Sequence, residues 1–375
     1  MSLEIRGRIV TPSRVLDDGV LTVVGDRIVD VVPTREWCVA NVGAVVPDFA
    51  GAVLPGLVDI HCHGGGGCSF SDPADAAAAA RHHHARGTTT VLGSLVTASG
   101  AALLEQVSSL RPLVEAGVLA GIHLEGPFLS HARCGAQDPR YLIPPDVELT
   151  RALLDAGDGA IRMMTLAPEL PGYSSVADEL RARGVAIALG HSDASYDEFL
   201  GALADAAVVT HLANGMPPLH HRSGGPVAAA LVAESVVLEL IADGVHVDAG
   251  FAAMVFGAAA ARVALITDAM AAEGMPDGAY SLGSQDVNVV DGVARLAGGS
   301  IAGGTSHLLE VVARTVRESG VSLLGAVRAA SSTPAAALGL DHECGALRPG
   351  LFADAAIVDE ELRLQRVLRR GEWIE

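Results

Sequence analysis

The chain has 375 residues, half of them apolar, and carries 44 acidic against 25 basic side chains, a net charge of −19 at pH 7. This composition predicts a globular protein with one large and one small domain, or two medium ones, and excludes a disordered chain. The negative field argues against a nucleic-acid partner, and an anionic substrate would need basic residues placed locally.

The cysteines and the chain start bear on location. Five scattered cysteines fit neither a disulfide framework nor a zinc knuckle. The start "MSLEIRGRIV" lacks the basic and apolar regions of a signal peptide. The most apolar stretch, 249–267, contains Arg262, so we expect a buried helix running into a strand and no membrane span. A cytoplasmic, reduced protein is expected.

Both ends of the chain are predicted to be β-rich. In "GVLTVVGDRIVDVV" two β-branched runs flank Gly25-Asp26, which indicates a hairpin. The last 30 residues show similar short runs broken by turns. Between these ends the pattern changes to a repeat of strand, loop and helix.

Eight continuous apolar runs in the middle region are typical of strands buried on both faces of a parallel sheet. They cover 56–63, 88–97, 117–126, 161–169, 185–192, 206–214, 236–247 and 262–270. Helices fit between them, such as one capped by Ser71 or Asp72 and ending at Gly87. Eight such units over roughly 250 residues predict an α/β fold, a (β/α)8 TIM-like barrel.

Polar side chains gather where these runs end. In a barrel the carboxyl ends of the strands meet at one face, so we expect these side chains to converge there. They are His61, His63, Glu125, His191, His211, Asn214, Asp243, His246 and Asp268.

Several of these residue types are metal ligands. His61 and His63, two apart on a strand, point to the same side, although an isolated pair of this kind is more often incidental. Glu125, His191 and His211 predict a site with three protein ligands and one open position, which a catalytic zinc needs. Each residue alone would more often be a salt-bridged or hydrogen-bonded core residue, and their convergence favours ligands. Asp268 would then be free to accept a proton from water.

Other histidines are given no metal role. His82, His83 and His84 are consecutive on a predicted helix, cannot meet at one ion, and are expected to be surface or helix-packing residues. His123 faces the same way as Glu125 and is expected to be structural support. His131, His307 and His342 lack a convincing context.

The motifs "PGLVDIHCHG", "HLEGPF", "GHSDA", "THLANGM", "DGVHV" and "ITDAMAAEGMPDGAYSLG" occur in this order along nearly the whole chain. In this they resemble the N-acetylglucosamine-6-phosphate deacetylases of the amidohydrolase superfamily. The resemblance implies a metal-bearing barrel at 51–344 and a small β-sandwich domain built from 1–50 and 345–375.

The same resemblance implies roles for individual residues. Glu125, His191 and His211 would hold the catalytic divalent metal, expected to be zinc, and Asp268 would act as general base and then acid. Because His61 and His63 are both present, a second divalent metal bridged by Glu125 is implied.

Substrate contacts follow from the resemblance as well. Asn214, Gly215 and His246 match the region that holds the sugar phosphate. Arg222 matches a basic residue that reaches across a homodimer interface to the phosphate, with a solvated loop residue as its alternative.

The chain departs from the family pattern at two places. Gln137 stands where the family often has a histidine near the scissile carbonyl, so polarisation of that carbonyl would depend more on the metal. Cys134 in the same loop is either a substrate contact or redox sensor, or an ordinary loop cysteine. Ala213 and Gly215 flank Asn214 with smaller side chains than usual, which leaves more room for substrate.

The sequence thus predicts metal-dependent hydrolysis of N-acetyl-D-glucosamine 6-phosphate to D-glucosamine 6-phosphate and acetate. One alternative is a related amidohydrolase acting on another amide, dihydroorotase- or aminoacylase-like. Another is a metal-binding barrel without catalysis.

Overall fold

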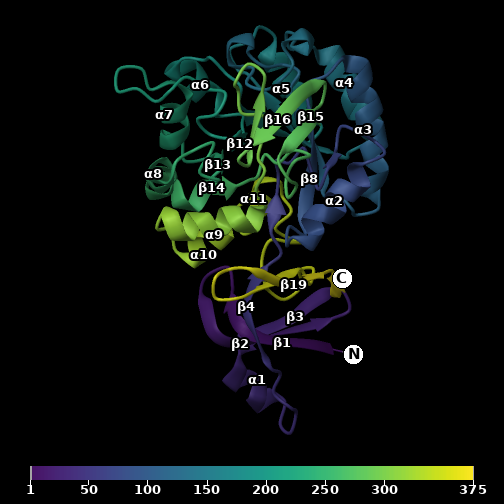
Figure 1. Ribbon diagram of the computed structural model, residues 1–375, viewed down its shortest axis with the longest axis vertical. Coiled ribbons are helices and arrows are strands. Elements are labelled where there is room, and N and C mark those ends of the chain that lie inside the picture. The colour runs from purple at the N-terminus through teal and green to yellow at the C-terminus, as the bar shows by residue number, and fades with distance from the viewer. Residues whose placement is uncertain (1, 375) are drawn as a thin grey trace.

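The computed structural model describes residues 2–374, which form a barrel and, below it, a smaller sheet (Figure 1). Eight parallel strands lie in the order β14-β13-β12-β11-β10-β9-β8-β5, and this confirms the predicted (β/α)8 barrel. The strands are β5 (Val58–Asp59), β8 (Thr90–Val96), β9 (Gly121–Glu125), β10 (Ile161–Leu166), β11 (Ala186–Leu189), β12 (Val208–Val209), β13 (Val237–Leu240) and β14 (Val263–Leu265).

The first and last barrel strands meet through the residues that follow them. The amide of Asp268 donates to the carbonyl oxygen of His61 over 3.0 Å, and Cys62 forms a parallel bridge with Ala269. These contacts bring the end of the first strand and the end of the last beside each other at the barrel mouth.

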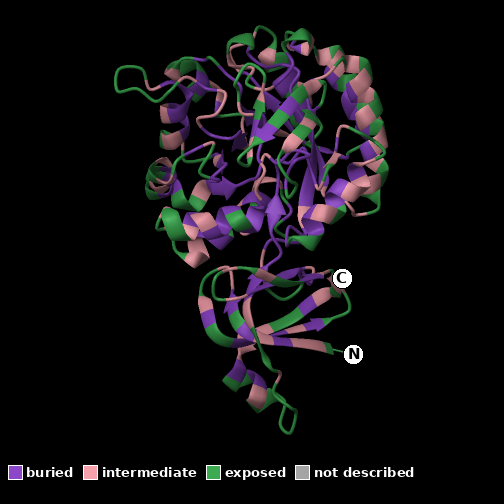
Figure 2. Cartoon of the chain, viewed as in Figure 1, coloured by how far each residue is buried: buried purple, intermediate pink, exposed green. Residues whose placement is uncertain are grey.

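The strands form because their apolar runs are buried from both sides (Figure 2). All five residues of β9 are buried, and Val58, Met163 and Ala264 belong to one cluster of buried side chains. Burial of about 1.5–3 kcal/mol per large apolar side chain stabilises this arrangement.

Helices surround the strands and close the connections between them. They are α2 (Ala76–Ala85), α3 (Gly100–Glu115), α4 (Val147–Gly157), α5 (Tyr173–Ala182), α6 (Tyr196–Ala202), α7 (Gly225–Val232), α8 (Ala249–Ala259), α9 (Leu308–Glu318), α10 (Leu323–Ala329) and α11 (Ser332–Ala337). The predicted buried helix before the last barrel strand is α8. Helix α2 begins after Asp75, later than predicted, because Asp72 accepts a hydrogen bond from the amide of Ala74 and closes a turn there.

The two chain ends combine in a second sheet, in the order β20-β19-β18-β4-β1-β2-β3. It is mixed, because β1 and β4 are parallel and the other pairs are antiparallel. Its strands are β1 (Ser2–Val10), β2 (Val15–Val24), β3 (Arg27–Pro33), β4 (Phe49–Pro55), β18 (Ala355–Val358), β19 (Leu364–Arg369) and β20 (Glu372–Ile374), with helix α1 (Thr34–Ala40) beside them. The predicted hairpin at Gly25-Asp26 joins β2 to β3.

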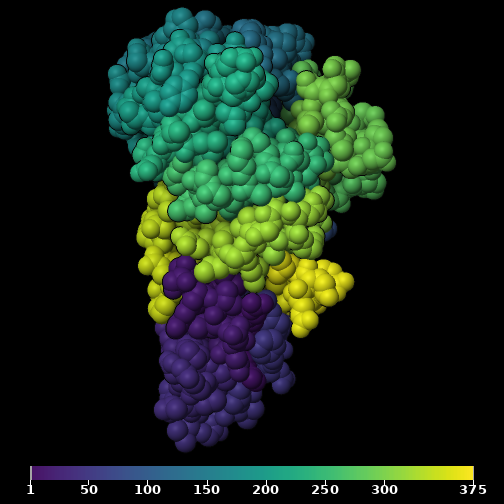
Figure 3. All heavy atoms as spheres, turned by 90° about the vertical axis from the view of Figure 1, so that its left-hand side faces the viewer, coloured from purple at the N-terminus to yellow at the C-terminus, as the bar shows by residue number. Residues whose placement is uncertain are grey.

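Figure 3 shows the terminal strands, purple and yellow, packed together beneath the barrel. A core of aliphatic side chains, among them Ile9, Leu21 and Leu368, holds this sheet together. The domain limits of 1–50, 51–344 and 345–375 stay a prediction, and β4 spans the first of them.

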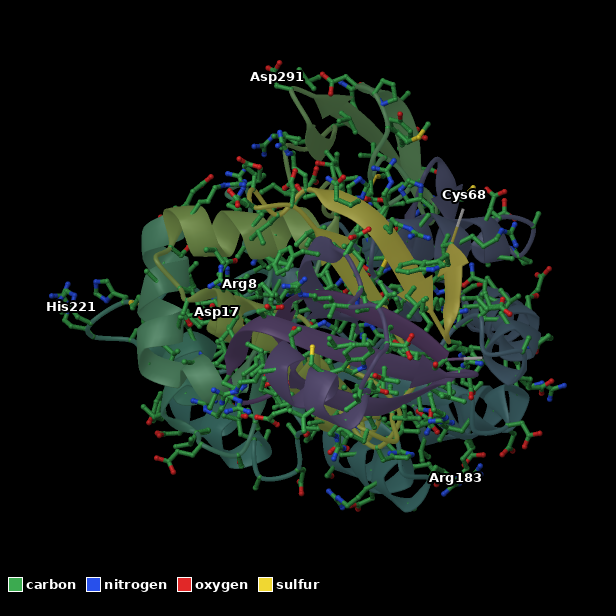
Figure 4. All side chains as sticks on the ribbon, turned by 90° about the horizontal axis from the view of Figure 1, so that it is seen from below. Arg8, Asp17, Cys68, Arg183, His221 and Asp291 are labelled. Carbon is green, nitrogen blue, oxygen red and sulfur yellow. The ribbon has the colours of Figure 1, made fainter. Side chains whose placement is uncertain are left out.

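A three-stranded antiparallel sheet was missing from the predicted elements. It consists of β15 (Gly278–Leu282), β16 (Gln285–Val290) and β17 (Val293–Leu296), and it projects as a light-green lobe in Figure 3. Asp291 and Gly292, with φ of 51° and 73°, make the turn between β16 and β17, and Figure 4 shows Asp291 at its tip. Val287 and Leu282 pack on Met270, which fixes this sheet over the loop that follows Asp268.

A two-stranded ribbon, β6 (Gly64–Gly65) and β7 (Cys68–Ser69), follows the first barrel strand. Short 3₁₀ turns occur at His131–Arg133, Pro139–Tyr141 and Ala260–Arg262. Among residues 2–374, no helix combines the length and the apolar character needed to cross a membrane.

Candidate metal centre

The predicted ligand residues come together at the mouth of the barrel. His61 and His63 follow β5, Glu125 is the last residue of β9, and His191 follows β11. His211 and Asp268 follow β12 and β14. All six side chains are at least 86% buried, so the convergence expected at this face occurs in the structure.

Backbone conformation turns three of these side chains inward. His191, His211 and Asp268 have φ of 47°, 26° and 48°, in the left-handed region that non-glycine residues seldom adopt. Such conformations cost of order 1–3 kcal/mol each and persist where the surroundings enforce them, which is typical of functional sites.

One cluster consists of Glu125, His191 and His211. Glu125 Oε1 lies 3.0 Å from His191 Nε2 and 2.9 Å from His211 Nε2, and the two nitrogens are 3.1 Å apart. Ligands of a tetrahedral zinc with bonds of about 2.0–2.1 Å are separated by about 3.3 Å. The spacing of these three atoms therefore suits one central ion.

A second cluster shares Glu125 with the first. His63 Nε2 lies 3.1 Å from Glu125 Oε2 and 3.1 Å from Asp268 Oδ1. His61 Nε2 lies 3.2 Å from His63 Nε2 and 3.4 Å from Asp268 Oδ1. Because Glu125 offers one oxygen to each side, it is placed to bridge two ions.

Hydrogen bonds on the far side of the imidazoles fix which nitrogen carries the proton. His61 Nδ1 faces Glu239 Oε2 at 3.0 Å, His63 Nδ1 faces the Ser94 carbonyl at 3.2 Å, and His191 Nδ1 faces the Arg133 carbonyl at 2.7 Å. Each of these oxygens accepts only, so each Nδ1 donates and each Nε2 lone pair points into the cluster. Facing lone pairs repel each other unless a cation lies between them. The inward orientation of these Nε2 lone pairs is therefore the observation that most favours a metal ion.

The charges in the cluster support each other. Although burial opposes ionisation, the nearby His61 and His63 lower the pKa of Asp268 to about 2. Burial likewise opposes protonation of His63, but when no ion is bound Asp268 and Glu125 outweigh it and raise the pKa of His63 to about 9, so that a proton takes the position on Nε2 that a cation would occupy. Asp268 is thus a carboxylate at neutral pH.

A cavity opens above the metal residues. Its walls include Gln137, His246, Asn214 and Gly215, together with Leu282 and Ile301 from the region of the unpredicted sheet. His246 Nδ1 lies 2.8 Å from Asp243 Oδ2, which orients its ring. Asn214, Gly215 and His246 are therefore beside Asp268 and Glu125, where a substrate contact needs them.

Gln137 has two partners in the structure. Its side-chain amide donates to Glu125 Oε2, and its Oε1 accepts from the amide of Thr97 over 2.8 Å. This ties the loop after β9 to the bridging carboxylate. Gly135 and Ala136 line the cavity beside it, and Cys134, the preceding residue, is half-buried.

Arg222 lies apart from the metal residues, on an exposed part of the connection between β12 and α7. Figure 4 shows its neighbour His221 projecting away from the body of the molecule. Arg222 Nη1 is 2.9 Å from His221 Nε2. Within this chain, Arg222 is not among the residues that line the cavity, as far as residues 2–374 show.

Two buried acids were missed in the sequence. Glu239, fully buried on β13, faces His61 and also accepts from the amide of His211 over 3.1 Å. Asp59, fully buried on β5, accepts from Thr267 Oγ1 over 2.6 Å, and burial raises the pKa of Asp59 to about 7. An acid inside an otherwise apolar strand was the signal that could have found both.

His123 was expected to be structural support, deeper in the barrel than Glu125. It is fully buried, with Nδ1 2.9 Å from Ser94 Oγ and Nε2 2.8 Å from Thr165 Oγ1. Burial keeps the pKa of His123 well below its usual value, so the ring is neutral. Its ring lies 4.6 Å from that of His61, centre to centre, and packs against it from within the barrel.

Comparison with known proteins places this site in a family. Residues 52–374 match the model of the amidohydrolase family. The chain belongs to the amidohydrolase family.

Its relatives are sugar-phosphate deacetylases. The chain is 34% identical to N-acetylglucosamine-6-phosphate deacetylase of Vibrio furnissii, covering 86% of this chain and 82% of that one. It is 32% identical to N-acetylgalactosamine-6-phosphate deacetylase of Escherichia coli O157:H7, covering 97% of both.

A solved structure is similar over the whole fold. It is a mutant N-acetyl-D-glucosamine-6-phosphate deacetylase from Mycobacterium smegmatis in complex with N-acetyl-D-glucosamine-6-phosphate, at 41% identity and a TM-score of 0.94 over 99% of both chains. These matches confirm the resemblance to this branch of amidohydrolases that the motifs indicate.

Proposed function

We propose that the chain hydrolyses the acetamide of N-acetyl-D-glucosamine 6-phosphate, releasing D-glucosamine 6-phosphate and acetate. The supporting observation is the pair of buried clusters that share Glu125, with Asp268 beside both and facing the cavity. The relatives at 34–41% identity act on, or are bound to, this substrate by name.

The donor set of imidazoles and carboxylates suits zinc or a similar divalent ion at one or both clusters. A divalent metal bound there would supply Lewis acidity, which polarises the acetamide carbonyl and lowers the pKa of water. Glu125, His191 and His211 would hold one ion, and His61 and His63 would help to hold another.

Asp268 moves the proton. As a carboxylate whose side chain is 14% exposed, it accepts a proton from the water whose oxygen forms the new bond to the carbonyl carbon. When the carbon–nitrogen bond breaks, Asp268 returns that proton to the departing amine. One water is consumed, and the acid and the amine leave as products.

His246, Asn214 and Gly215 would position the phosphorylated sugar from the cavity wall. Arg222 would reach the phosphate of the substrate that is bound in a neighbouring subunit. The working form would then be a homodimer. This would supply positive charge that the acidic chain lacks locally. We place the enzyme in the cytoplasm, where its five free cysteines would stay reduced.

The test combines metal analysis with acetate release from three substrates: N-acetylglucosamine 6-phosphate, its galactosamine epimer and unphosphorylated N-acetylglucosamine. Chelation should abolish release and zinc should restore it. The phosphorylated glucosamine substrate should exceed the plain sugar in kcat/KM by at least about 100-fold, since His246 and Arg222 would have no phosphate to bind in the plain sugar.

The outcomes separate the alternatives. Equal rates with and without phosphate would favour an amidohydrolase for another amide, dihydroorotase- or aminoacylase-like. Bound metal with no acetate release from any of the three would favour a barrel without this catalysis. Faster release from the galactosamine epimer would move the assignment to the activity named for the Escherichia coli relative.

The role of Arg222 has its own test. Arg222→Gln should raise KM for the phosphorylated substrate and leave kcat/KM for the plain sugar unchanged. Sedimentation of the wild type as a monomer would contradict the role across an interface.

A further inference from the structure

A second histidine–carboxylate cluster lies outside the barrel mouth. It joins His82 on α2, Glu273 in the loop after β14, and His307 at the start of α9, with one donor atom of each within 4.8 Å of the others. The sequence predicts only a surface or packing role for His82 and none for His307. The structure gives both histidines the same buried carboxylate as a neighbour.

The donor atoms of this cluster lack hydrogen bonds. Glu273 is fully buried, its Oε2 lies 2.6 Å from His82 Nε2, and its Oε1 contacts His307 Nδ1. Within residues 2–374, none of these four atoms makes a hydrogen bond of acceptable geometry. A buried carboxylate whose imidazole neighbours make no well-aligned hydrogen bond to it is poorly compensated for its lost hydration, and a cation facing all four atoms would remove that cost.

We propose that His82, Glu273 and His307 bind a divalent transition metal, with zinc as the ion that their chemistry fits best. Two imidazole nitrogens and one carboxylate are an established zinc ligand set and leave one position for water. The histidine side chains are 18% and 11% exposed, so both rings border solvent although their ligating nitrogens are buried. This site is separate from the reaction proposed above and does not depend on it.

An ion here would tie the loop that follows Asp268 to α2 and α9, and backbone hydrogen bonds link that loop to the one that follows His63. The amides of Gly66 and Gly67 donate to the carbonyls of Glu273 and Ala271 over 2.9 and 2.8 Å. The close fit leaves no room for a side chain, because a Cβ on Gly65 would lie 2.6 Å from Glu273 Oε2. These loops begin at His63 and Asp268, so the ion would hold the segments that carry both.

A contact of Arg86 with His307 competes with metal binding. Its Nη1 lies 2.7 Å from His307 Nε2, and because a guanidinium only donates, Nε2 accepts and Nδ1 carries the proton. When Nδ1 binds an ion, the proton moves to Nε2 and Arg86, which is exposed, turns away. Arg86→Gln removes this competition, since an amide oxygen can accept from Nε2–H, and should tighten zinc binding about tenfold.

The experiment measures zinc per chain in the purified full-length protein after saturation and removal of excess ion. Wild type should hold one equivalent more than Glu273→Gln. Glu310→Gln is the matched control, because Glu310 accepts from the backbone amide of His307 and is not one of the three ligands. It should keep the full count.

Crystals of the wild type, measured at the zinc absorption edge, decide the matter even if Glu273→Gln fails to fold. An anomalous peak between His82, Glu273 and His307 supports the proposal. Peaks at the barrel mouth alone, or equal zinc counts in wild type and Glu273→Gln, would overturn it and leave an ion-paired triad.

Discussion

The barrel mouth and the terminal sheet differ in the kind of side chain that they bury. At the mouth, Glu125 and Glu239 are buried among histidines, and His191 and Asp268 hold left-handed backbone conformations. In the terminal sheet the core is aliphatic, and the ion pair of Arg6 with Asp18 lies at the surface. Three left-handed residues and a group of buried acids thus gather where chemistry is expected, whereas the left-handed non-glycine residues of the terminal sheet, Leu362 and Arg370, lie in the turns between its strands.

The largest expected effect tests whether the mouth serves chemistry. Asp268→Asn should lower kcat by about 1000-fold or more, because an amide cannot accept the proton of the attacking water. Asparagine tolerates the left-handed conformation at φ 48°, so the fold should persist. Metal content and kcat should be measured together.

Asp286→Asn is the control, because Asp286 is exposed on the small sheet beside the site. It should keep wild-type kcat. Wild-type turnover in Asp268→Asn with metal retained would remove Asp268 from the mechanism.

The next effect belongs to the terminal sheet. Leu21→Ala, at a fully buried core position, should lower the free energy of unfolding by about 2–5 kcal/mol through lost burial and the cavity left behind. Denaturant unfolding followed by circular dichroism measures this. Val24→Ala on the same strand, at a side chain that is 50% exposed, should cost far less.

The contrast requires that Leu21→Ala leave kcat/KM per folded molecule unchanged. A fall in kcat/KM that matches the loss of stability would show that the terminal sheet shapes the mouth directly.

The fold was predictable because its signals are local. Eight apolar runs and a Gly25-Asp26 turn can be recognised within short windows, and each is found as a strand or a hairpin. The sheet at 278–296 was not predicted, although its Asp291-Gly292 turn carries the same kind of signal. The eight apolar runs already account for a complete barrel, and this sheet is an addition to that fold.

The site was only partly predictable. A sequence locates the ends of strands, but it does not tell which residues within strands and loops point into the site. Glu125 ends a strand, His191 and His211 follow strands, and the three side chains meet as expected. Glu239 lies within a strand, and Glu273 within a loop, so their burial depends on segments far away in the sequence. Arg222 cannot be assigned within one chain, since its predicted partner is a second copy.

A smaller effect should come from the residue that orients His61. Glu239→Gln weakens the acceptor for His61 Nδ1 and should lower metal affinity at the His61–His63 cluster by about 10–100-fold. Metal titration followed by calorimetry would resolve this step. Glu234→Gln, at an exposed position just before the same strand, should leave affinity unchanged. Unchanged affinity in Glu239→Gln would mean that the metal does not depend on this support.

The smallest effect is expected at the surface of the terminal sheet. Asp18 accepts from Arg6 Nε at 2.8 Å and from Thr34 Oγ1 at 2.6 Å, and these hydrogen bonds lower the pKa of Asp18 to about 2. Because the side chain is 45% exposed, solvent screens the pair, and Asp18→Asn should cost no more than about 1 kcal/mol at pH 7.

The pH dependence gives this prediction its sign. A lowered pKa in the folded state stabilises the fold above the unfolded value of about 3.9, and that contribution is lost as the pH falls toward 2. The difference in unfolding free energy between wild type and Asp18→Asn should therefore be constant from pH 7 to 5 and shrink below pH 4. Asp17→Asn, at a side chain that is 95% exposed, should show neither the loss nor the pH dependence. An equal loss in both variants would mean that the contacts of Asp18 add no stability of their own at this edge of the sheet.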